Sequence, residues 1–267
     1  MRIVTLIENL VYKKDLVAEH GLSFYIETEN SKILFDTGQT SNFLANAGSL
    51  GVDISTIDTL VISHGHYDHT GGLYPFLKAN RKAKVYAKQD VFLKKYHGIE
   101  RFIGTTYDPL ELDGRINFVS QKTQIDEDIF IMPDIPISNP HDTHFNHFKI
   151  LTEKGFENDE FTDELFLTIT HGKELSIISS CSHRGITNIA EAAKKEFDLP
   201  VNLLLGGFHL IESTEDQFET IRNCFKQMNP KLIGVCHCTG IDNYAKFLRD
   251  FKSSVFYNHT GKVLEIF

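Results

Sequence analysis

The chain has 267 residues, of which 41% are apolar and 24% charged, as is ordinary for a globular protein. Its 36 acidic and 27 basic residues give a net charge of −9, which argues against a nucleic-acid partner because phosphate contacts need a basic surface. No apolar run approaches the roughly 20 residues that a membrane span needs. With four cysteines, too few for a disulfide scaffold, we expect a cytoplasmic protein with no membrane partner.

The first part of the chain predicts strands in quick succession. Runs of β-branched and aromatic residues predict strands at 2–7, 22–28, 32–36, 57–63 and 84–87. The run at 57–63 is apolar throughout, which is typical of a strand buried on both faces. We expect one helix after a cap at Ser41 and another at 88–98. Lys94 and Lys95 fall in the second helix, where we interpret the local basic residues as a solvated helix face and turn, with an anion-steering patch as the alternative.

The second half is more regular once a long loop has passed. Strands near 116–119 and 128–132 lead into 132–147, whose Pro, Asn, Asp and His residues are typical of a functional or mobile loop. The remaining expected elements are a hairpin at 165–180 with Gly172 in its turn, helices at 185–197, 213–228 and 241–251, and strands at 201–207, 231–237, 255–258 and 262–267. Thr214 is expected to cap the helix at 213–228.

Strands with interleaved helices in both halves indicate an α/β fold of two sheets packed face to face and covered by helices. The chain contains no linker, low-complexity tract or short repeat. A length of 267 residues suits one large domain or two small ones. We therefore predict a single domain over residues 1–267.

The stretch LVISHGHYDHTGGL at 60–73 gathers residue types that bind metals directly after an apolar run: His64, His66, Asp68 and His69. Imidazole and carboxylate together suit a borderline divalent cation such as zinc, manganese or iron. One tetrahedral ion accommodates all four poorly, whereas two neighbouring ions do so with His64 and His66 on one and Asp68 and His69 on the other. The alternative, a polar loop without metal, is disfavoured by the preceding buried strand and the glycines that follow.

This stretch carries the His-x-His-x-Asp-His signature and resembles the metallo-β-lactamase superfamily. ILFDTG at 33–38 resembles that superfamily's strand-ending Asp-Thr-Gly. The resemblance implies that Asp36 contacts the metal ligands and orients them rather than binding the metal itself. IENL, EHGLS, FDTGQT, CSHRGITNI, GGFHL and CHCTG further resemble the metal-dependent hydrolase-like subgroup that contains an archaeal dihydropterin-aminobenzene-ribofuranosyl-phosphate synthase. The resemblance implies a four-layer αββα sandwich with mixed sheets. It also implies one or two divalent ions, zinc first, with manganese, iron or magnesium as alternatives.

Two metals need ligands from later in the chain as well. The superfamily normally adds a histidine, a bridging aspartate and a last histidine, each after a strand. Here SSCSH stands where the aspartate is expected, so the bridge is either absent or made by another group. His183 is the favoured ligand and Cys181 the alternative. His237 is the expected terminal ligand. His209 is interpreted as a metal ligand or a substrate contact, with a core histidine as the third alternative.

Other polar residues leave alternatives open. His20 is either a solvated loop residue or a catalytic or substrate contact. Cys236, His237 and Cys238 suggest a thiolate zinc site, but in a strand the cysteines point to one side and His237 to the other, so the three converge only if the strand bends. We therefore interpret both cysteines as small buried apolar residues. Three histidines belong either to a substrate loop or to plain surface: His141, His144 and His147. Asp163 and Glu164 form an acidic turn that is either solvated or close to the metals.

Three functions fit these features. The first is a metal-dependent hydrolase of a small, phosphorylated or unphosphorylated metabolite, in which metal activates water and Asp68 both binds metal and orients the nucleophile or relays a proton. The second is a transferase in which a pterin-methyl diphosphate loses pyrophosphate to an aryl nucleophile. Its aromatic pocket has four candidate residues, Tyr107, Phe145, Phe148 and Phe208. The third is a metallated pterin- or nucleotide-binding module without catalysis, which the missing bridging aspartate favours.

Overall fold

The computed structural model describes residues 1–266, which divide into two compact units. Unit 1 comprises residues 1–120 and 146–163 together with the C-terminal segment from His259, and unit 2 comprises residues 121–145 and 164–258. Among the described residues, no helix is both long and apolar enough to cross a membrane. That residues 1–267 form one domain stays a prediction.

Unit 1 contains a mixed seven-stranded sheet with the order β18-β1-β2-β3-β4-β5-β8. The strands are β1 (Arg2–Ile7), β2 (Ser23–Glu27), β3 (Lys32–Phe35), β4 (Thr59–Val61), β5 (Lys84–Ala87), β8 (Ile116–Phe118) and β18 (Val263–Glu265). Strands β3, β4, β5 and β8 run parallel to one another, whereas β18, β1, β2 and β3 are antiparallel. The five strands predicted before residue 90 are confirmed, although the apolar run 57–63 forms a strand of only three residues.

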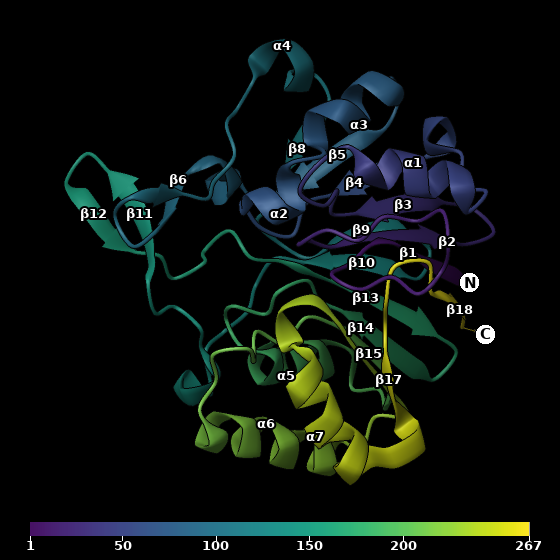
Figure 1. The fold of residues 1–267 in the computed structure, drawn as a ribbon, viewed down its shortest axis with the longest axis vertical. Helices are drawn as coiled ribbons and strands as arrows, with labels where there is room; N and C mark the ends of the chain where they lie inside the picture. Colours follow the sequence, from purple (N-terminus) through teal and green to yellow (C-terminus); the bar gives the residue numbers. More distant parts are fainter. Residues whose placement is uncertain (267) are drawn as a thin grey trace. The chain divides into compact units, whose positions relative to one another are not determined.

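The helices of unit 1 are α1 (Asn42–Ser49), α2 (Tyr67–Thr70), α3 (Leu73–Ala79) and α4 (Pro109–Leu112), with 3₁₀ turns η1 (Ile54–Thr56) and η2 (Gln89–Phe92). Phe43 of α1 and Phe76 of α3 are buried in one core with Leu34 and Leu60 of the sheet. Both helices lie on the same side of that sheet (Figure 1). Burial of these apolar side chains is the main force that holds the helices there.

A separate four-stranded antiparallel sheet completes unit 1, and we call it the accessory sheet. Its order is β12-β11-β6-β7, formed by β6 (Lys94–His97), β7 (Arg101–Phe102), β11 (Phe148–Thr152) and β12 (Gly155–Asn158). The predicted helix at 88–98 is therefore wrong. The chain makes one 3₁₀ turn and then a strand, because β6 pairs with β11 from over 50 residues later and this pairing outweighs local propensity.

Unit 2 contains a second mixed seven-stranded sheet with the order β17-β16-β15-β14-β13-β10-β9. The strands are β9 (Thr123–Asp126), β10 (Ile129–Met132), β13 (Phe166–His171), β14 (Glu174–Ile178), β15 (Val201–Gly206), β16 (Leu232–Val235) and β17 (Val255–Tyr257). Strands β14 to β17 are parallel. The predicted hairpin at 165–180 is confirmed as β13 and β14. The two last predicted strands join different sheets, and Phe267, included in the second, lies outside the described residues.

Three helices cover one face of this sheet (Figure 1): α5 (Ile186–Phe197), α6 (Glu215–Met228) and α7 (Ile241–Phe251). The 3₁₀ turns of the unit are η3 (Pro140–Asp142), η4 (His237–Thr239) and η5 (Lys252–Ser254). Ile189 of α5, Phe225 of α6 and Phe247 of α7 are buried in one core with Leu204 and Ile233 of the sheet. The three helices predicted from apolar periodicity are thus confirmed.

Candidate metal centre

The first group of predicted ligands lies in the loop between β4 and α3 of unit 1, residues 63–69, which we call the ligand loop. His64, His66, Asp68 and His69 are all buried there. The donor atoms of His64 and His66 lie within 4.8 Å of each other, as do those of His64 and His69. His69 Nε2 is 3.5 Å from Asp68 Oδ2. The loop therefore gathers the ligand types that the motif predicted.

Asp36 fixes the orientation of two of these imidazoles. It follows β3 directly, and its φ of 60° is a left-handed conformation that is uncommon for non-glycine residues. Its carboxylate accepts hydrogen bonds from Ser63 N at 2.8 Å and Ser63 Oγ at 2.7 Å, and it lies 2.9 Å from His69 Nδ1. Ser63 Oγ is also 2.8 Å from His64 Nδ1. With both Nδ1 atoms engaged, Nε2 is the nitrogen with which His64 and His69 can coordinate a metal.

The pKa values of His64 and His69 in the ligand loop are shifted in opposite directions. Burial alone would lower the pKa of His69, but the carboxylates of Asp68 and Asp36 outweigh it and raise the pKa to about 10. Burial lowers the pKa of His64, and the neighbouring His69 lowers it further. The uncharged form of His64, the form in which an imidazole can bind a metal, is therefore favoured, whereas the buried carboxylates favour a positive charge on His69.

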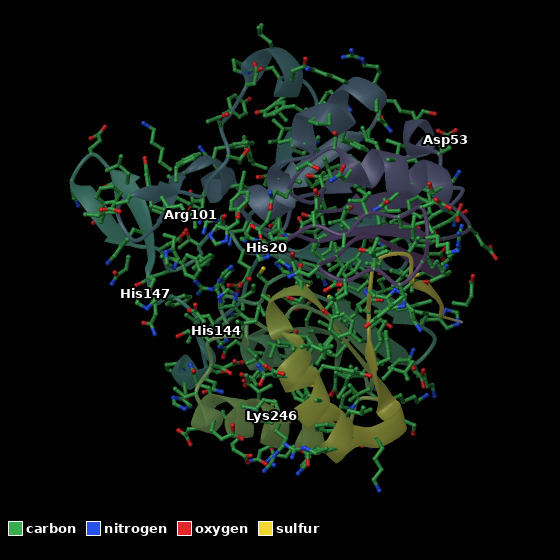
Figure 2. All side chains as sticks on the ribbon, in the orientation of Figure 1. His20, Asp53, Arg101, His144, His147 and Lys246 are labelled. Atoms are coloured by element: carbon green, nitrogen blue, oxygen red, sulfur yellow. The ribbon has the colours of Figure 1, made fainter. Side chains whose placement is uncertain are left out.

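His20 is the exposed member of this neighbourhood. Its Nε2 lies 3.2 Å from Asp68 Oδ2, and 52% of its side chain is exposed. Asn9 contacts the other ring nitrogen at 3.5 Å, and its amide oxygen accepts the N–H of Gly21 at 3.3 Å. Asn9 thus holds the short loop that carries His20, and His20 is labelled in Figure 2. This placement suits a contact with substrate or a proton exchange with Asp68.

The second group of predicted ligands belongs to unit 2 and follows three neighbouring parallel strands. Cys181 and His183 follow β14, His209 follows β15, and His237 follows β16. Carboxyl ends of parallel strands meet at one edge of a sheet, which is why residues far apart in sequence converge. Each of the three loops contains a left-handed non-glycine residue: Ser182 at φ 58°, His209 at φ 50° and His237 at φ 50°.

Cys238 also joins this group, contrary to its interpretation as a plain buried residue of a strand. The donor atoms of Cys181, His237 and Cys238 lie within 4.8 Å of one another, and so do those of Cys181, His183 and His209. The prediction that His237 and Cys238 point to opposite sides is wrong, because β16 ends at Val235 and a 3₁₀ turn follows. A Cβ on Gly207 would lie 2.6 Å from Cys238 Sγ, so the close approach requires glycine.

The Cys238 thiol is acidic despite its burial. Burial raises the pKa of the thiol, but hydrogen bonds with Cys181 and His209 and the nearby imidazole of His237 lower it well below the ordinary value. The backbone N–H of His209 donates to the sulfur at 3.3 Å. A thiolate is a soft ligand, which favours zinc or iron over magnesium.

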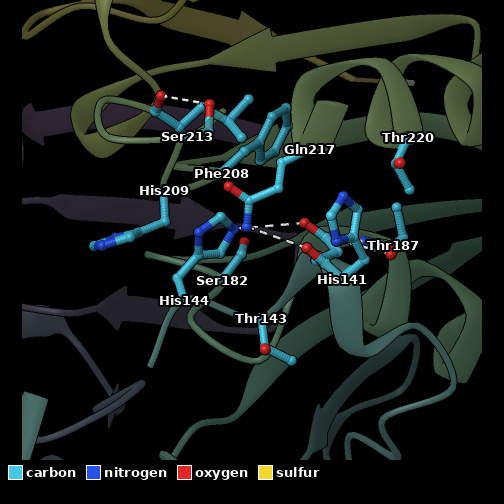
Figure 3. Close-up of polar contacts among 12 residues, drawn as sticks. His141, Thr143, His144, Ser182, Thr187, Phe208, His209, Ser213, Gln217 and Thr220 are labelled. Atoms are coloured by element: carbon cyan, nitrogen blue, oxygen red, sulfur yellow. Dashed lines mark hydrogen bonds and ion pairs between the residues drawn. The ribbon is translucent and has the colours of Figure 1, made fainter. Parts of the chain in front are cut away.

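Residues 133–145 form a loop of unit 2 whose η3 turn contacts α5 and α6. Asp142 accepts hydrogen bonds from Thr187 N at 2.7 Å and Thr187 Oγ1 at 2.6 Å, and its other oxygen is 3.4 Å from His144 Nε2. The His144 ring lies 5.2 Å from that of His209 (Figure 3). His144 is therefore a buried neighbour of the candidate ligands. No local sequence pattern indicates this position, since it depends on the packing of the loop against His209.

Asp163 and Glu164 are buried, so the solvated acidic turn is excluded. In unit 1, Asp163 Oδ2 accepts the N–H of Gly65 at 2.7 Å. In unit 2, Glu164 accepts the N–H groups of His183 and Arg184, each at 2.7 Å. Each carboxylate thus holds the backbone beside a predicted ligand.

Comparison with known proteins defines the class. The family model of the metallo-β-lactamase superfamily matches residues 16–173. An uncharacterized protein of Methanocaldococcus jannaschii, MJ0448, is 33% identical over 98% of this chain and 98% of its own length. The 7,8-dihydropterin-6-methyl-4-(beta-D-ribofuranosyl)-aminobenzene-5'-phosphate synthase of the same organism is 30% identical over 99% of this chain and 96% of its own. The chain belongs to the metallo-β-lactamase superfamily.

A solved structure of the same superfamily supports the fold. Tm1679, described as a metal-dependent hydrolase of the β-lactamase superfamily, shares 31% identity and a TM-score of 0.88 over 100% of this chain and 99% of its own. The predicted metallo-β-lactamase fold, α/β with mixed sheets, is thereby confirmed. The buried histidines also fit the divalent metal that this family implies, because imidazole, carboxylate and thiol donors are the ligands of zinc and iron.

Proposed function

We propose that the protein is a metal-dependent hydrolase of a small anionic metabolite. The observation that carries the proposal is the hydrogen-bonded set in which Asp36 orients His69 directly and His64 through Ser63. Carboxylates that hold the far nitrogen of an imidazole are typical of metal-binding histidines. The full-length likeness to Tm1679 supports the same class.

In this proposal the ligands are His64, His66, Asp68, His69, His183 and His237, and the cofactor is one or two ions, zinc first. A bound divalent ion supplies Lewis acidity, which polarises a phosphoryl or carbonyl oxygen and lowers the pKa of water toward about 7. Asp68 contacts both His69 and His20, so it can orient the nucleophile and pass a proton to His20. Cys181 and His209 are kept as contacts of the ligands or substrate.

Arg101 of β7 supports an anionic substrate. Its guanidinium donates to the hydroxyl of Tyr67 at 2.8 Å and lies 5.6 Å from the centre of that ring. Tyr67 belongs to the ligand loop, so the exposed arginine, which is labelled in Figure 2, is anchored to that loop. A planar guanidinium matches phosphate and carboxylate groups better than an ammonium group does.

The test is metal analysis followed by a substrate panel. We expect purified protein to contain zinc, or to take up zinc, manganese or cobalt, and to hydrolyse at least one of a phosphomonoester, a phosphodiester, a lactone or a thioester. The His66→Ala variant should lose metal and turnover, whereas His171→Ala, an exposed histidine at the end of β13, should keep both. Turnover that needs no metal, or that survives in His66→Ala, would refute the proposal.

A second candidate is the transferase, favoured by the full-length likeness to the archaeal synthase. Of the aromatic residues predicted for its pocket, Phe148 lies 5.2 Å from the His66 ring, whereas Phe208 is buried in the core of unit 2 against Phe225 and cannot line a pocket. Titration of a pterin, and assay of pyrophosphate release from a pterin-methyl diphosphate with an arylamine, separate the two. Pyrophosphate release that requires the arylamine favours the transferase.

A further inference from the structure

Lys95 of β6 is buried with its charge. Only 1% of its side chain is exposed, and its Nζ lies 2.6 Å from Asp159 Oδ2 and 2.9 Å from Asp163 Oδ1. Burial alone would lower the pKa of Lys95, but the two carboxylates, Asp163 first, raise it above the ordinary value. The three residues are therefore a buried cluster of one ammonium group and two carboxyl groups, which we call the lysine cluster. Burial raises the pKa of Asp163, and the neighbouring Lys95 opposes that rise.

The lysine cluster holds the backbone of the ligand loop. Asp163 uses one oxygen for Lys95 and the other to accept the N–H of Gly65 at 2.7 Å. Gly65 stands between His64 and His66 in the sequence. A Cβ on Gly65 would come within 2.1 Å of the Val91 carbonyl oxygen, so this segment is packed directly onto the η2 turn. The peptide between two predicted ligands is thus fixed by a charge-assisted hydrogen bond.

The cluster also reaches the side chain of a ligand, through Phe161. Asp159 Oδ1 accepts the N–H of Phe161 at 2.8 Å, and Phe161 is left-handed, with φ 50°. Lys95 Nζ lies 4.9 Å from the centre of the Phe161 ring. That ring meets the His66 imidazole edge to face, with centroids 5.2 Å apart. Both the backbone and one imidazole of the ligand loop therefore rest on residues that the cluster orders.

Stability alone is a poor explanation for this cluster. Burying an ion cluster costs solvation, and apolar residues of similar volume often stabilise a protein as well or better. We propose that Lys95, Asp159 and Asp163 form a positioning network that holds His64 and His66 in metal-binding geometry. The proposal rests on the metal binding proposed above. Asp163 is a positioning residue, because it acts through the Gly65 peptide and Lys95 keeps it in place.

The first test compares two replacements at one position, with cobalt as the probe. Asp163→Ala removes the acceptor of the Gly65 N–H, and we expect cobalt affinity to fall about 10- to 100-fold, as for other groups that orient metal ligands. Asp163→Asn keeps an acceptor oxygen and should recover part of that loss. The visible absorption of bound cobalt should change in Asp163→Ala, since the ligand field depends on the geometry of His64 and His66.

The matched control is Asn80→Ala, in the same unit. Asn80 is a buried side chain that donates to the carbonyls of Ile54 and Ile57, which belong to the η1 turn and the residue after it rather than to the ligand loop. Its replacement should lower thermal stability and leave cobalt affinity and spectrum unchanged. If Asp163→Ala behaves like this control, the cluster is structural only and the inference fails. If the wild type itself binds no cobalt, zinc or manganese, the proposed function fails instead.

A third variant guards against misfolding. The combination Lys95→Met, Asp159→Asn and Asp163→Leu replaces the cluster by neutral side chains of similar size and leaves no uncompensated buried charge. We expect this protein to fold, as judged by circular dichroism, and still to bind cobalt about 10- to 100-fold more weakly than wild type. A folded triple variant with wild-type cobalt affinity would overturn the inference.

Discussion

The four predicted ligands of unit 1 come from a single loop spanning six positions, whereas unit 2 assembles its candidates from loops after three strands, with Cys181 and Cys238 separated by 57 residues. In unit 1 the imidazoles are oriented by buried carboxylates, chiefly Asp36. In unit 2 the strand order and left-handed turns at His209 and His237 bring the donors together. One set is therefore held by charge and the other by backbone topology.

The largest expected effect tests whether both sets matter. Asp68→Asn in unit 1 and His183→Ala in unit 2 should each lower metal-dependent turnover by more than about 100-fold, beyond what loss of an outer partner of a ligand usually costs. The measurement is turnover on the best substrate of the panel, with metal content determined on the same samples. Full activity in His183→Ala would remove this residue of unit 2 from the proposed centre.

The next effect tests whether a carboxylate charge matters more for metal binding in unit 1 than in unit 2. Asp36→Asn removes a carboxylate that contacts an imidazole, so zinc affinity should fall about 10- to 100-fold. Glu164→Gln is the counterpart in unit 2. Because Glu164 holds the backbone N–H groups of His183 and Arg184, and glutamine keeps one acceptor oxygen, the loss should stay below about tenfold. Chelator competition measures both. Equal losses of zinc affinity in the two variants would show that the charge of Asp36 beside His69 contributes no more to metal binding than the backbone contacts of Glu164.

A smaller effect concerns the thiols of the unit 2 group. Cys238→Ser replaces a soft donor by a hydroxyl at nearly constant size, so zinc affinity should fall about tenfold while manganese affinity changes little. Cobalt offers a direct readout, because a sulfur-to-cobalt charge-transfer band is present only where a thiolate coordinates. If the wild type lacks this band, Cys238 is a neighbour of the centre rather than a ligand.

The same contrast explains what the sequence could predict. The ligand loop is contiguous, and Asp36 follows a strand in a recognisable Asp-Thr-Gly, so both could be found from local patterns. Cys238 could not, because the position of its sulfur beside the Cys181 and His237 donors depends on the left-handed backbone of His237 and on the missing Cβ of Gly207. The helix predicted around Lys95 is wrong for a related reason: its strand exists through pairing with β11, and its two carboxylates lie 64 and 68 residues away.

The smallest expected effect separates stability from metal binding through two predicted helix caps, Ser41 and Thr214. Only Thr214 makes the bonds, accepting the N–H of Gln217 at 3.2 Å while Gln217 reaches back to the Thr214 N–H. The Ser41 side chain makes no capping bond, and Thr40 Oγ1 accepts the N–H of Asn42 instead. Serine and threonine are both favoured caps by residue type, so the difference lies in backbone geometry: Thr214 is extended, at ψ 160°, whereas Ser41 is not, at ψ 5°.

Thr214→Ala should therefore lower the free energy of unfolding by about 1 kcal/mol, the usual cost of a lost cap. Ser41→Ala should change it by less than about 0.5 kcal/mol, as ordinary surface substitutions do. Since the chain has no tryptophan, urea unfolding followed by circular dichroism is the suitable measurement. Neither variant should alter zinc affinity. A zinc defect in Thr214→Ala would mean that the ligands of unit 2 depend on the stability of α6, and strand order alone would then not account for their convergence.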